Sequence, residues 1–356
     1  MRRWLHLVPI ALAFIGCDST APETEGDDVI VRTETEEEWA QYVANVDFAA
    51  GYVPRCEVGD GTRPRVLVTG FGRFLENEEN ATGRMLSRWV PGLEYPLTEP
   101  PPKGEVDDPA AQLRVSQGVV TLDGVGEVDV CGLVLPVFWD VAAIVALREV
   151  AAFRPDFVLM NGIAGDVQPI WLELGAVNEA VSLPDGSGTL APVTSGSPLV
   201  LEASADERAR GNLLSWTETR VGAEAEIANL APERDAAGVA FGEIVTGVRF
   251  AGYPRSSNTY LCNNTTYAVG YAMDHPNDVI RLLQPSQPRE GGPTGVDVSL
   301  ADDMSKIPRV FVHWPKTLSG EHLDRGAAVM KAIVASQLSA TAGPTRGDDA
   351  IADFTD

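Results

Sequence analysis

The chain has 356 residues, a formal net charge of −24 and 44% hydrophobic residues. This length allows one large domain or two small ones, and the apolar content is sufficient to bury a substantial core. An acidic surface of this size repels phosphate backbones and anionic lipid headgroups, so no nucleic-acid partner is expected.

The first residues, MRRWLHLVPIALAFIGCDST, combine two arginines with a short apolar stretch that ends at Gly16. This pattern is typical of a signal peptide, because crossing a bilayer takes about 20 apolar residues and this run is shorter. The Phe-Ile-Gly-Cys ending resembles a bacterial lipoprotein box, with residues 1–16 removed and Cys17 acylated. We therefore expect an exported lipoprotein on the periplasmic or cell-surface side of a membrane, held there by its lipid alone. Plain secretion and an uncleaved anchor are the alternatives.

Beyond an expected tether and N-terminal extension (17–60), strand-like and helix-like segments alternate along the chain. Strands are expected at 65–74, at 118–137 as a pair joined by a Gly turn, at 157–165 and at 309–315. Helices are expected at 83–90, 140–156, 262–275 and 322–338, the second of them capped by Asp140, and 243–254 is interpreted as a helix end leading to a turn. This alternation predicts an α/β protein, with one three-layer α/β/α domain (61–342) around a mostly parallel mixed sheet of the phosphorylase/hydrolase-like kind.

Segments rich in proline, glycine, serine or charged residues interrupt this alternation and are interpreted as insertions near 91–113, 181–236 and 284–306. The acidic tail, 343–356, is expected to be mobile.

The chain has four cysteines. If Cys17 carries lipid, an odd number remains, and an oxidising compartment would close one pair. Cys56 and Cys131 flank the first strand–helix–strand region and are the expected pair, which leaves Cys262 outside the bond. No Cys-x-x-Cys motif and no Cys/His cluster occurs, so no metal site is expected.

Cys262 precedes a helix-like run, and a helix N-terminus lowers the pKa of a thiol. His313, late in an expected strand, could supply an imidazole, and Glu173 could orient that ring to complete a Cys-His-acid triad. By spacing alone, a packed structural cysteine is the commoner interpretation of such a residue.

Four motifs, VTGFGRF (68–74), NGIAGDVQPIWLELGAVN (161–178), AGYPRSSNTYLCNNTTY (251–267) and VFVHWP (310–315), occur in this order. Together they resemble the pyroglutamyl peptidase I family of cysteine peptidases, and the Thr-Tyr-Leu-Cys-Asn block is the most specific of the four. The resemblance implies Cys262 as nucleophile, His313 as general base and acid, and Glu173 as the residue that orients it.

The resemblance also implies that Phe71 and Phe74 sandwich a flat pyroglutamyl ring, with Ile163 and Leu261 as further substrate contacts and no cofactor. Asn178 and Asn263 match family positions and could equally cap a helix or fix a loop. The chain departs from the family pattern at Gly72-Arg73, Asp166-Val167, Leu174 and Ser257-Asn258.

The sequence thus favours a thiol peptidase that removes an N-terminal pyroglutamyl group from peptides. The alternatives are a thiol amidohydrolase acting on another small acyl-peptide and a surface-tethered binding protein without turnover. No oligomeric state is predicted.

Overall fold

A computed structural model describes residues 35–74, 79–165, 169–181, 183–188, 198–254, 259–285 and 287–351. The expected signal peptide, Cys17 and the first part of the tether lie outside these residues. No helix within the described ranges combines the length and the apolar character that a membrane span requires.

The centre of the molecule is one mixed sheet in the order β13-β8-β12-β4-β1-β3-β2, to which β5 and β9 are added beside β12. The four middle strands run parallel, whereas β2, β8 and β13 pair antiparallel with their neighbours. Strand β5 pairs antiparallel with β12 and parallel with β9. The strands of this sheet are β1 (Arg65–Phe71), β2 (Arg114–Leu122), β3 (Gly126–Leu135), β4 (Phe157–Ala164), β5 (Ile170–Glu173), β8 (Leu213–Leu214), β9 (Val248–Ala251), β12 (Arg309–Pro315) and β13 (Thr345–Arg346).

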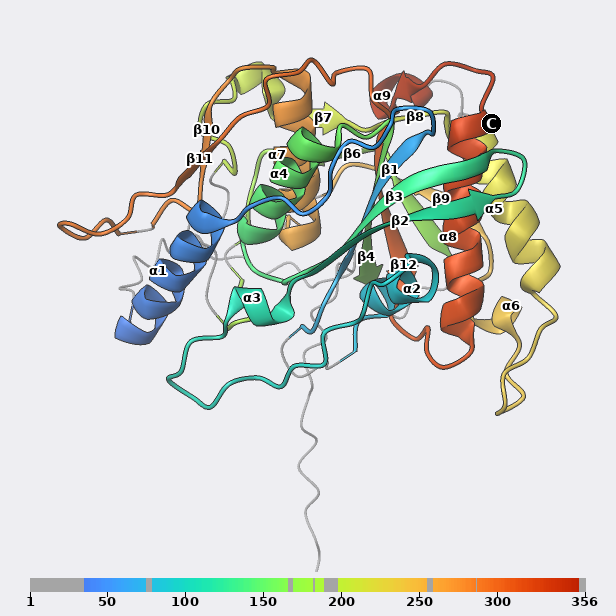
Figure 1. Ribbon diagram of the computed structural model, residues 1–356, viewed down its shortest axis with the longest axis horizontal. Helices are drawn as coiled ribbons and strands as arrows, with labels where there is room; N and C mark the ends of the chain where they lie inside the picture. Colours follow the sequence, from blue (N-terminus) through green and yellow to red (C-terminus); the bar gives the residue numbers. More distant parts are fainter. Residues whose placement is uncertain are drawn as a thin grey trace, which may run out of the picture.

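Helices cover both faces of the sheet, as Figure 1 shows. One face carries α1 (Glu36–Gly51), α4 (Val141–Phe153) and α7 (Leu261–Asp274), and the other carries α2 (Ala81–Trp89), α5 (Trp216–Leu230) and α8 (His322–Ser339). The middle strands are apolar on both faces because each face packs on a helical layer. The prediction of a three-layer α/β fold with a mostly parallel mixed sheet is confirmed.

Short elements complete the chain. They are α3 (Pro109–Gln112), α6 (Phe241–Ile244), α9 (Gly347–Ile351), a 3₁₀ turn (Ala205–Glu207), and two small antiparallel pairs, β6 (Gly175–Val177) with β7 (Ala209–Gly211) and β10 (Ile280–Leu282) with β11 (Val296–Val298).

Three local expectations were wrong. Residues 248–251 form strand β9 rather than part of a turn, because they pair in parallel with β5. Residues 345–351 of the acidic tail are folded rather than mobile, since β13 pairs with β8 and Arg346 bonds Asp274. Asp140 starts α4 but does not cap it with its side chain, which instead accepts hydrogen bonds from Asn264 and the Leu283 amide.

The expected disulfide, Cys56–Cys131, is present. It joins the segment after α1 to strand β3, and both cysteines are buried. The buried carboxylate of Glu149 on α4 supports the same segment by accepting hydrogen bonds from the Arg55 and Cys56 amides and from the Tyr52 hydroxyl. The N-terminal extension is therefore packed on the core from α1 onward.

Candidate active site

His313 and Glu173 form a buried pair on neighbouring strands. His313 lies on β12, which pairs antiparallel with β5, and Glu173 is the last residue of β5. His313 Nδ1 lies 2.9 Å from Glu173 Oε1, and the two side chains are 6% and 8% exposed. In this geometry a protonated Nδ1 donates to the carboxylate, which fixes the ring and leaves Nε2 as the nitrogen available for proton transfer.

Cys262 lies on the same face of the sheet as this pair. It belongs to the first turn of α7 and is 9% exposed. A Cβ atom added to Gly162 on β4 would lie 3.0 Å from Cys262 Sγ, so the sulfur sits directly against that glycine. Gly162 is the register partner of His313 in the parallel β4–β12 pair, and register partners of parallel strands project to the same face. The structure thus brings the three candidate catalytic residues together at one place on the sheet.

Phe71 lies on the other side of this place. Thr69 on β1 is the register partner of Met160 on β4, and Phe71 and Gly162 are each two residues further along their strands. Strands β1 and β12 are the two neighbours of β4 in the sheet, so Phe71 and His313 come from the strands on either side of Gly162. Phe71, Leu261 and Cys262 belong to the same buried cluster.

Aromatic rings extend this surface toward Phe74. The Phe74 ring, partly buried, meets Tyr260 edge-on at a centroid distance of 6.0 Å, and Trp139 also meets Tyr260 edge-on at 5.2 Å. Tyr260 directly precedes α7, and its hydroxyl donates to the Pro184 carbonyl. A row of apolar rings thus lies next to the turn that carries the thiol.

Ile163 is placed differently from the other expected substrate contacts. It is half-buried and packs against the cluster on the opposite face of the sheet, as its position next to Gly162 in the strand requires. The structure therefore does not bring its side chain together with Cys262.

Two asparagines and one aspartate hold the first turn of α7. Asn263 accepts from the Val177 amide at 2.8 Å and donates to the Val177 and Glu179 carbonyls, so it joins the helix to the end of β6. Asn264 donates to Asp140 Oδ1 at 2.6 Å. Burial raises the pKa of the Asp140 carboxyl, although its hydrogen bonds from Leu283 and Asn264 act in the opposite direction.

Asn178 has a structural role. Its side chain donates to the Val200 carbonyl and accepts from the Val200 amide, both at 2.9 Å. Asn178 and Asn263 both fix backbone segments, which agrees with the structural alternative considered for them.

Cys56, Cys131 and Glu149 form a separate group whose ligand atoms lie close enough together to hold a metal ion. The two sulfurs are joined to each other and Glu149 is occupied by the amides of the adjoining segment, so this group is a structural clamp rather than a metal or catalytic site.

Sequence reasoning missed several residues of the site region. Trp139 was not singled out, Asp140 was assigned only to a helix start, and Gly162 only to a motif. The positive φ of Asp140, 58°, is rare for a non-glycine residue and marks a constrained position, but backbone angles leave no sign in a sequence.

No family model matches the chain, and no curated protein does. Solved structures with a similar fold include pyroglutamyl peptidase I from Bacillus amyloliquefaciens, with 14% identity, a TM-score of 0.48, and coverage of 78% of this chain and 98% of the other. A second is pyrrolidone carboxyl peptidase from Thermococcus litoralis, with 16% identity, a TM-score of 0.46, and coverage of 77% and 93%.

The matched structures are pyroglutamyl peptidases. A mutant pyrrolidone carboxyl peptidase from Pyrococcus furiosus is also among them, with 16% identity, a TM-score of 0.44, and coverage of 77% and 98%. At such identities, the case for an activity depends on the side chains of the site itself.

Proposed function

We propose that the protein is a cysteine-type hydrolase that removes an N-terminal pyroglutamyl group from peptides. The proposal rests on one observation: Cys262 Sγ lies against the same face of the sheet as the His313–Glu173 pair. A thiol, an imidazole and a carboxylate held by three separate elements are the components of a nucleophilic triad.

In the proposed reaction His313 takes the proton of the Cys262 thiol, and the thiolate attacks the carbonyl carbon of the scissile amide. The C–N bond then breaks as the imidazolium returns that proton to the leaving amine. Water, deprotonated by His313, cleaves the resulting thioester and restores the thiol. Glu173 stays ionised and stabilises the imidazolium in both steps.

The negatively charged oxygen of each tetrahedral intermediate must be stabilised by hydrogen-bond donors. The backbone N–H groups of the first turn of α7 are suited to this, because a helix has no internal acceptors for its first amides. In other enzymes one such donor contributes roughly 3–4 kcal/mol to catalysis.

Specificity for a pyroglutamyl group is supported by the apolar rings beside the thiol. Phe71, Phe74 and Tyr260 offer flat apolar surfaces to a lactam that carries no ammonium group. An ordinary charged N-terminus would lose its hydration against these apolar rings.

The disulfide supports export of the protein, since such bonds persist in oxidising compartments and are rare in the cytosol. We propose that the mature chain is displayed outside the cytoplasm, with acylation at Cys17 as its anchor to the membrane. Mass spectrometry of the mature N-terminus tests this proposal, which is abandoned if residues 1–16 are still present or Cys17 is unmodified.

The activity is tested with chromogenic pyroglutamyl, prolyl and alanyl amides, using wild-type protein and the Cys262→Ser and Cys262→Ala variants. We expect turnover of the pyroglutamyl amide alone, abolished in both variants. Turnover of another acyl amide that also needs Cys262 would indicate a different thiol amidohydrolase. Binding of the amides without any turnover would indicate a binding protein.

A further inference from the structure

A buried ion pair lies directly beside the aromatic side of the candidate site. Arg73 stands between the end of β1 and Phe74, and its Nη2 lies 2.5 Å from Asp107 Oδ2. The two side chains are 1% and 7% exposed. Asp107 belongs to the segment 91–113, so the pair joins an insertion to the loop that carries Phe74.

Asp107 also connects the N-terminal extension to that insertion through hydrogen bonds. Gln41 on α1 accepts from the Asp107 amide at 2.7 Å and donates to the Asp107 carbonyl at 2.8 Å. The other carboxylate oxygen of Asp107, Oδ1, accepts a hydrogen bond from Gln112 Nε2 at 2.8 Å. Through its two carboxylate oxygens and its backbone N–H and C=O groups, Asp107 therefore joins α1, the segment 91–113 and the loop that carries Arg73 and Phe74.

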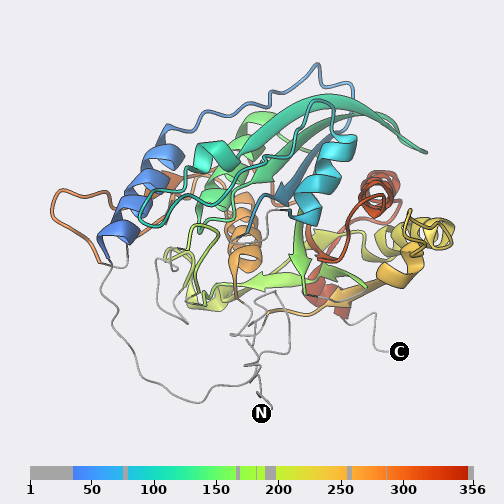
Figure 2. The same ribbon diagram turned by 90° about the horizontal axis from the view of Figure 1, so that it is seen from below.

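Helix α1 is itself fixed at several points. The Tyr42 hydroxyl donates to the Leu283 and Pro293 carbonyls, and Arg289 lies over the Trp39 ring and pairs with Glu36. Figure 2 shows α1 in blue between the teal segment 91–113 and the orange segment after β10. The disulfide and Glu149 hold the chain that follows α1.

These contacts have a consequence for Phe74. A buried guanidinium is tolerated only where its partner is present, so Arg73 has one favourable position, and the backbone of the next residue is placed with it. The Phe74 ring also packs against the buried cluster that includes Phe71 and meets Tyr260 edge-on.

We propose that Asp107 and Arg73 are positioning residues that set the location of Phe74 at the rim of the pocket, with α1 as their outer support. By this means the insertion and the N-terminal extension together determine which acyl groups the site accepts. The proposal rests on the proposed function for the identity of the substrate, but not for the geometry of the rim.

The test uses the full mature chain and two readouts. The first is KM and kcat for a pyroglutamyl amide. The second is the rate at which Cys262 reacts with the small reagent iodoacetamide and with the bulky reagent N-phenylmaleimide, which requires no substrate. Asp129→Asn is the matched control, since Asp129 is a buried carboxylate paired with Arg63 at the opposite end of β1.

For Asp107→Asn we expect KM to rise about tenfold with little change in kcat, as when binding common to the ground and transition states is lost. The ratio of the bulky to the small alkylation rate should rise severalfold, because the rim is no longer held. Asp129→Asn should leave both readouts at the wild-type values.

Loss of stability could produce similar effects, and the double variant Arg73→Met/Asp107→Leu separates the two causes. An apolar pair of similar volume restores stability after a buried ion pair is removed. Our proposal requires KM and the alkylation ratio to stay raised in a stably folded double variant. It is overturned if both return to wild-type values, or if Asp107→Asn behaves as Asp129→Asn does. Absence of wild-type turnover would remove the proposed function, and the alkylation ratio would still decide whether the rim is held by this pair.

Discussion

His313 Nδ1 lies 2.9 Å from Glu173 Oε1, and the two residues come from strands that adjoin in the sheet but lie 140 positions apart in the chain (313 minus 173). The pair is buried on the face of the sheet that carries Cys262, so we expect the carboxylate to act on the thiol through the imidazole.

This relationship predicts the effect of Glu173→Gln. An amide has nearly the shape of the carboxylate but cannot stabilise an imidazolium, and its NH₂ group can donate to Nδ1 and move the ring proton to Nε2. By comparison with other triads, kcat should fall roughly 10²- to 10⁴-fold while the protein stays folded. The alkylation rate of Cys262 near neutral pH should fall in parallel. An unchanged alkylation rate would show that Glu173 does not act on the thiol through His313.

Gly162 offers a steric test of the same arrangement. A Cβ at this position would lie 3.0 Å from Cys262 Sγ and 2.8 Å from the Phe311 ring, both closer than normal packing allows. Gly162→Ala should therefore displace the sulfur and reduce kcat at least tenfold, a barrier increase of about 1.4 kcal/mol.

Gly252→Ala is a suitable control, because a Cβ there meets no atom within 4 Å. Normal activity in Gly162→Ala would mean that the catalytic sulfur does not occupy the place against β4 that the structure gives it.

Much of this arrangement could be predicted from the sequence, because local patterns report local structure. The apolar run at 157–165 and the amphipathic run at 140–156 correctly indicated β4 and α4, and the motif around Cys262 correctly indicated the start of α7. Since functional residues of such sheets gather at the carboxyl ends of strands, a common location for Cys262 and His313 could also be expected.

The remaining features depend on contacts between distant segments, which local patterns do not report. The stretch 248–251 is a strand only because β5 lies beside it, and nothing near Asp107 in sequence indicates a partner at Arg73. Ile163 was assigned to the pocket through a motif, but alternation along β4 directs it to the other face. The acidic composition after Gly343 indicates a solvated tail, whereas in the structure Arg346 of this tail is bonded to the distant residue Asp274.

The disulfide predicts a large effect on stability and a small one on the site. Cys56 and Cys131 are 75 residues apart, and closing a loop of this length lowers the free energy of the native state relative to the unfolded chain by about 4 kcal/mol. The double variant Cys56→Ala/Cys131→Ala should lower the free energy of unfolding by roughly 2–5 kcal/mol in urea titrations.

Cys262 should still be alkylated at the wild-type rate in that variant under native conditions, because Cys131 is the register partner of Leu67 on β1, four residues before Phe71. Loss of Cys262 reactivity in a folded double variant would contradict this separation.

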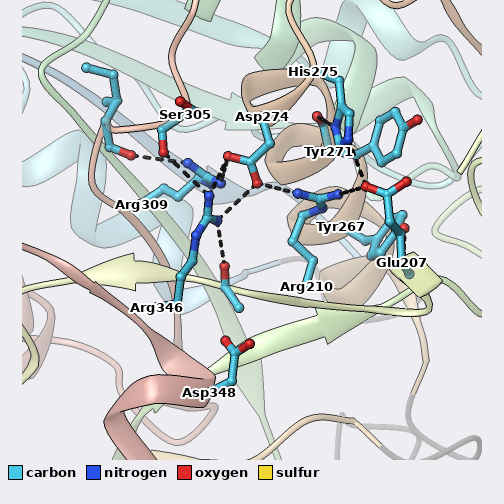
Figure 3. A network of polar contacts seen from close by, with 12 residues as sticks. Glu207, Arg210, Tyr267, Tyr271, Asp274, His275, Ser305, Arg309, Arg346 and Asp348 are labelled. Carbon is cyan, nitrogen blue, oxygen red and sulfur yellow. Dashed lines mark hydrogen bonds and ion pairs between the residues drawn. The ribbon is translucent and has the colours of Figure 1, made fainter. Parts of the chain in front are cut away.

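The last prediction concerns Asp274, the last residue of α7, whose first turn carries Cys262. Figure 3 shows the polar contacts around Asp274. Its carboxylate forms ion pairs with Arg309 at 2.5 Å, with Arg346 at 2.8 Å and with Arg210. Burial alone would raise the pKa of Asp274, but the guanidinium groups, Arg309 foremost, outweigh burial and hold the pKa below its ordinary value. Burial lowers the pKa of Arg309 to about 10, so that residue is still charged at neutral pH.

A carboxyl whose pKa is lower in the folded than in the unfolded chain stabilises the fold at pH values above the unfolded pKa, about 3.9 for Asp. This contribution is lost as the pH falls from about 4 through the folded pKa, because protonation then removes the partner of three arginines. Asp274→Asn should cost about 3–5 kcal/mol at pH 7, since Arg309 remains buried and charged without its counterion. It should also flatten the fall of stability below about pH 4.

The measurement is the free energy of unfolding from urea titrations at several pH values between about 3 and 7, a range that spans the unfolded pKa of Asp. Asp297→Asn is the matched control, because Asp297 makes an ion pair with Arg281 in which both side chains are about half exposed. An exposed pair of this kind contributes at most about 1 kcal/mol, so that variant should follow the wild-type curve closely. Equal losses for the two variants at pH 7 would show that the three arginines around Asp274 do not depend on its charge.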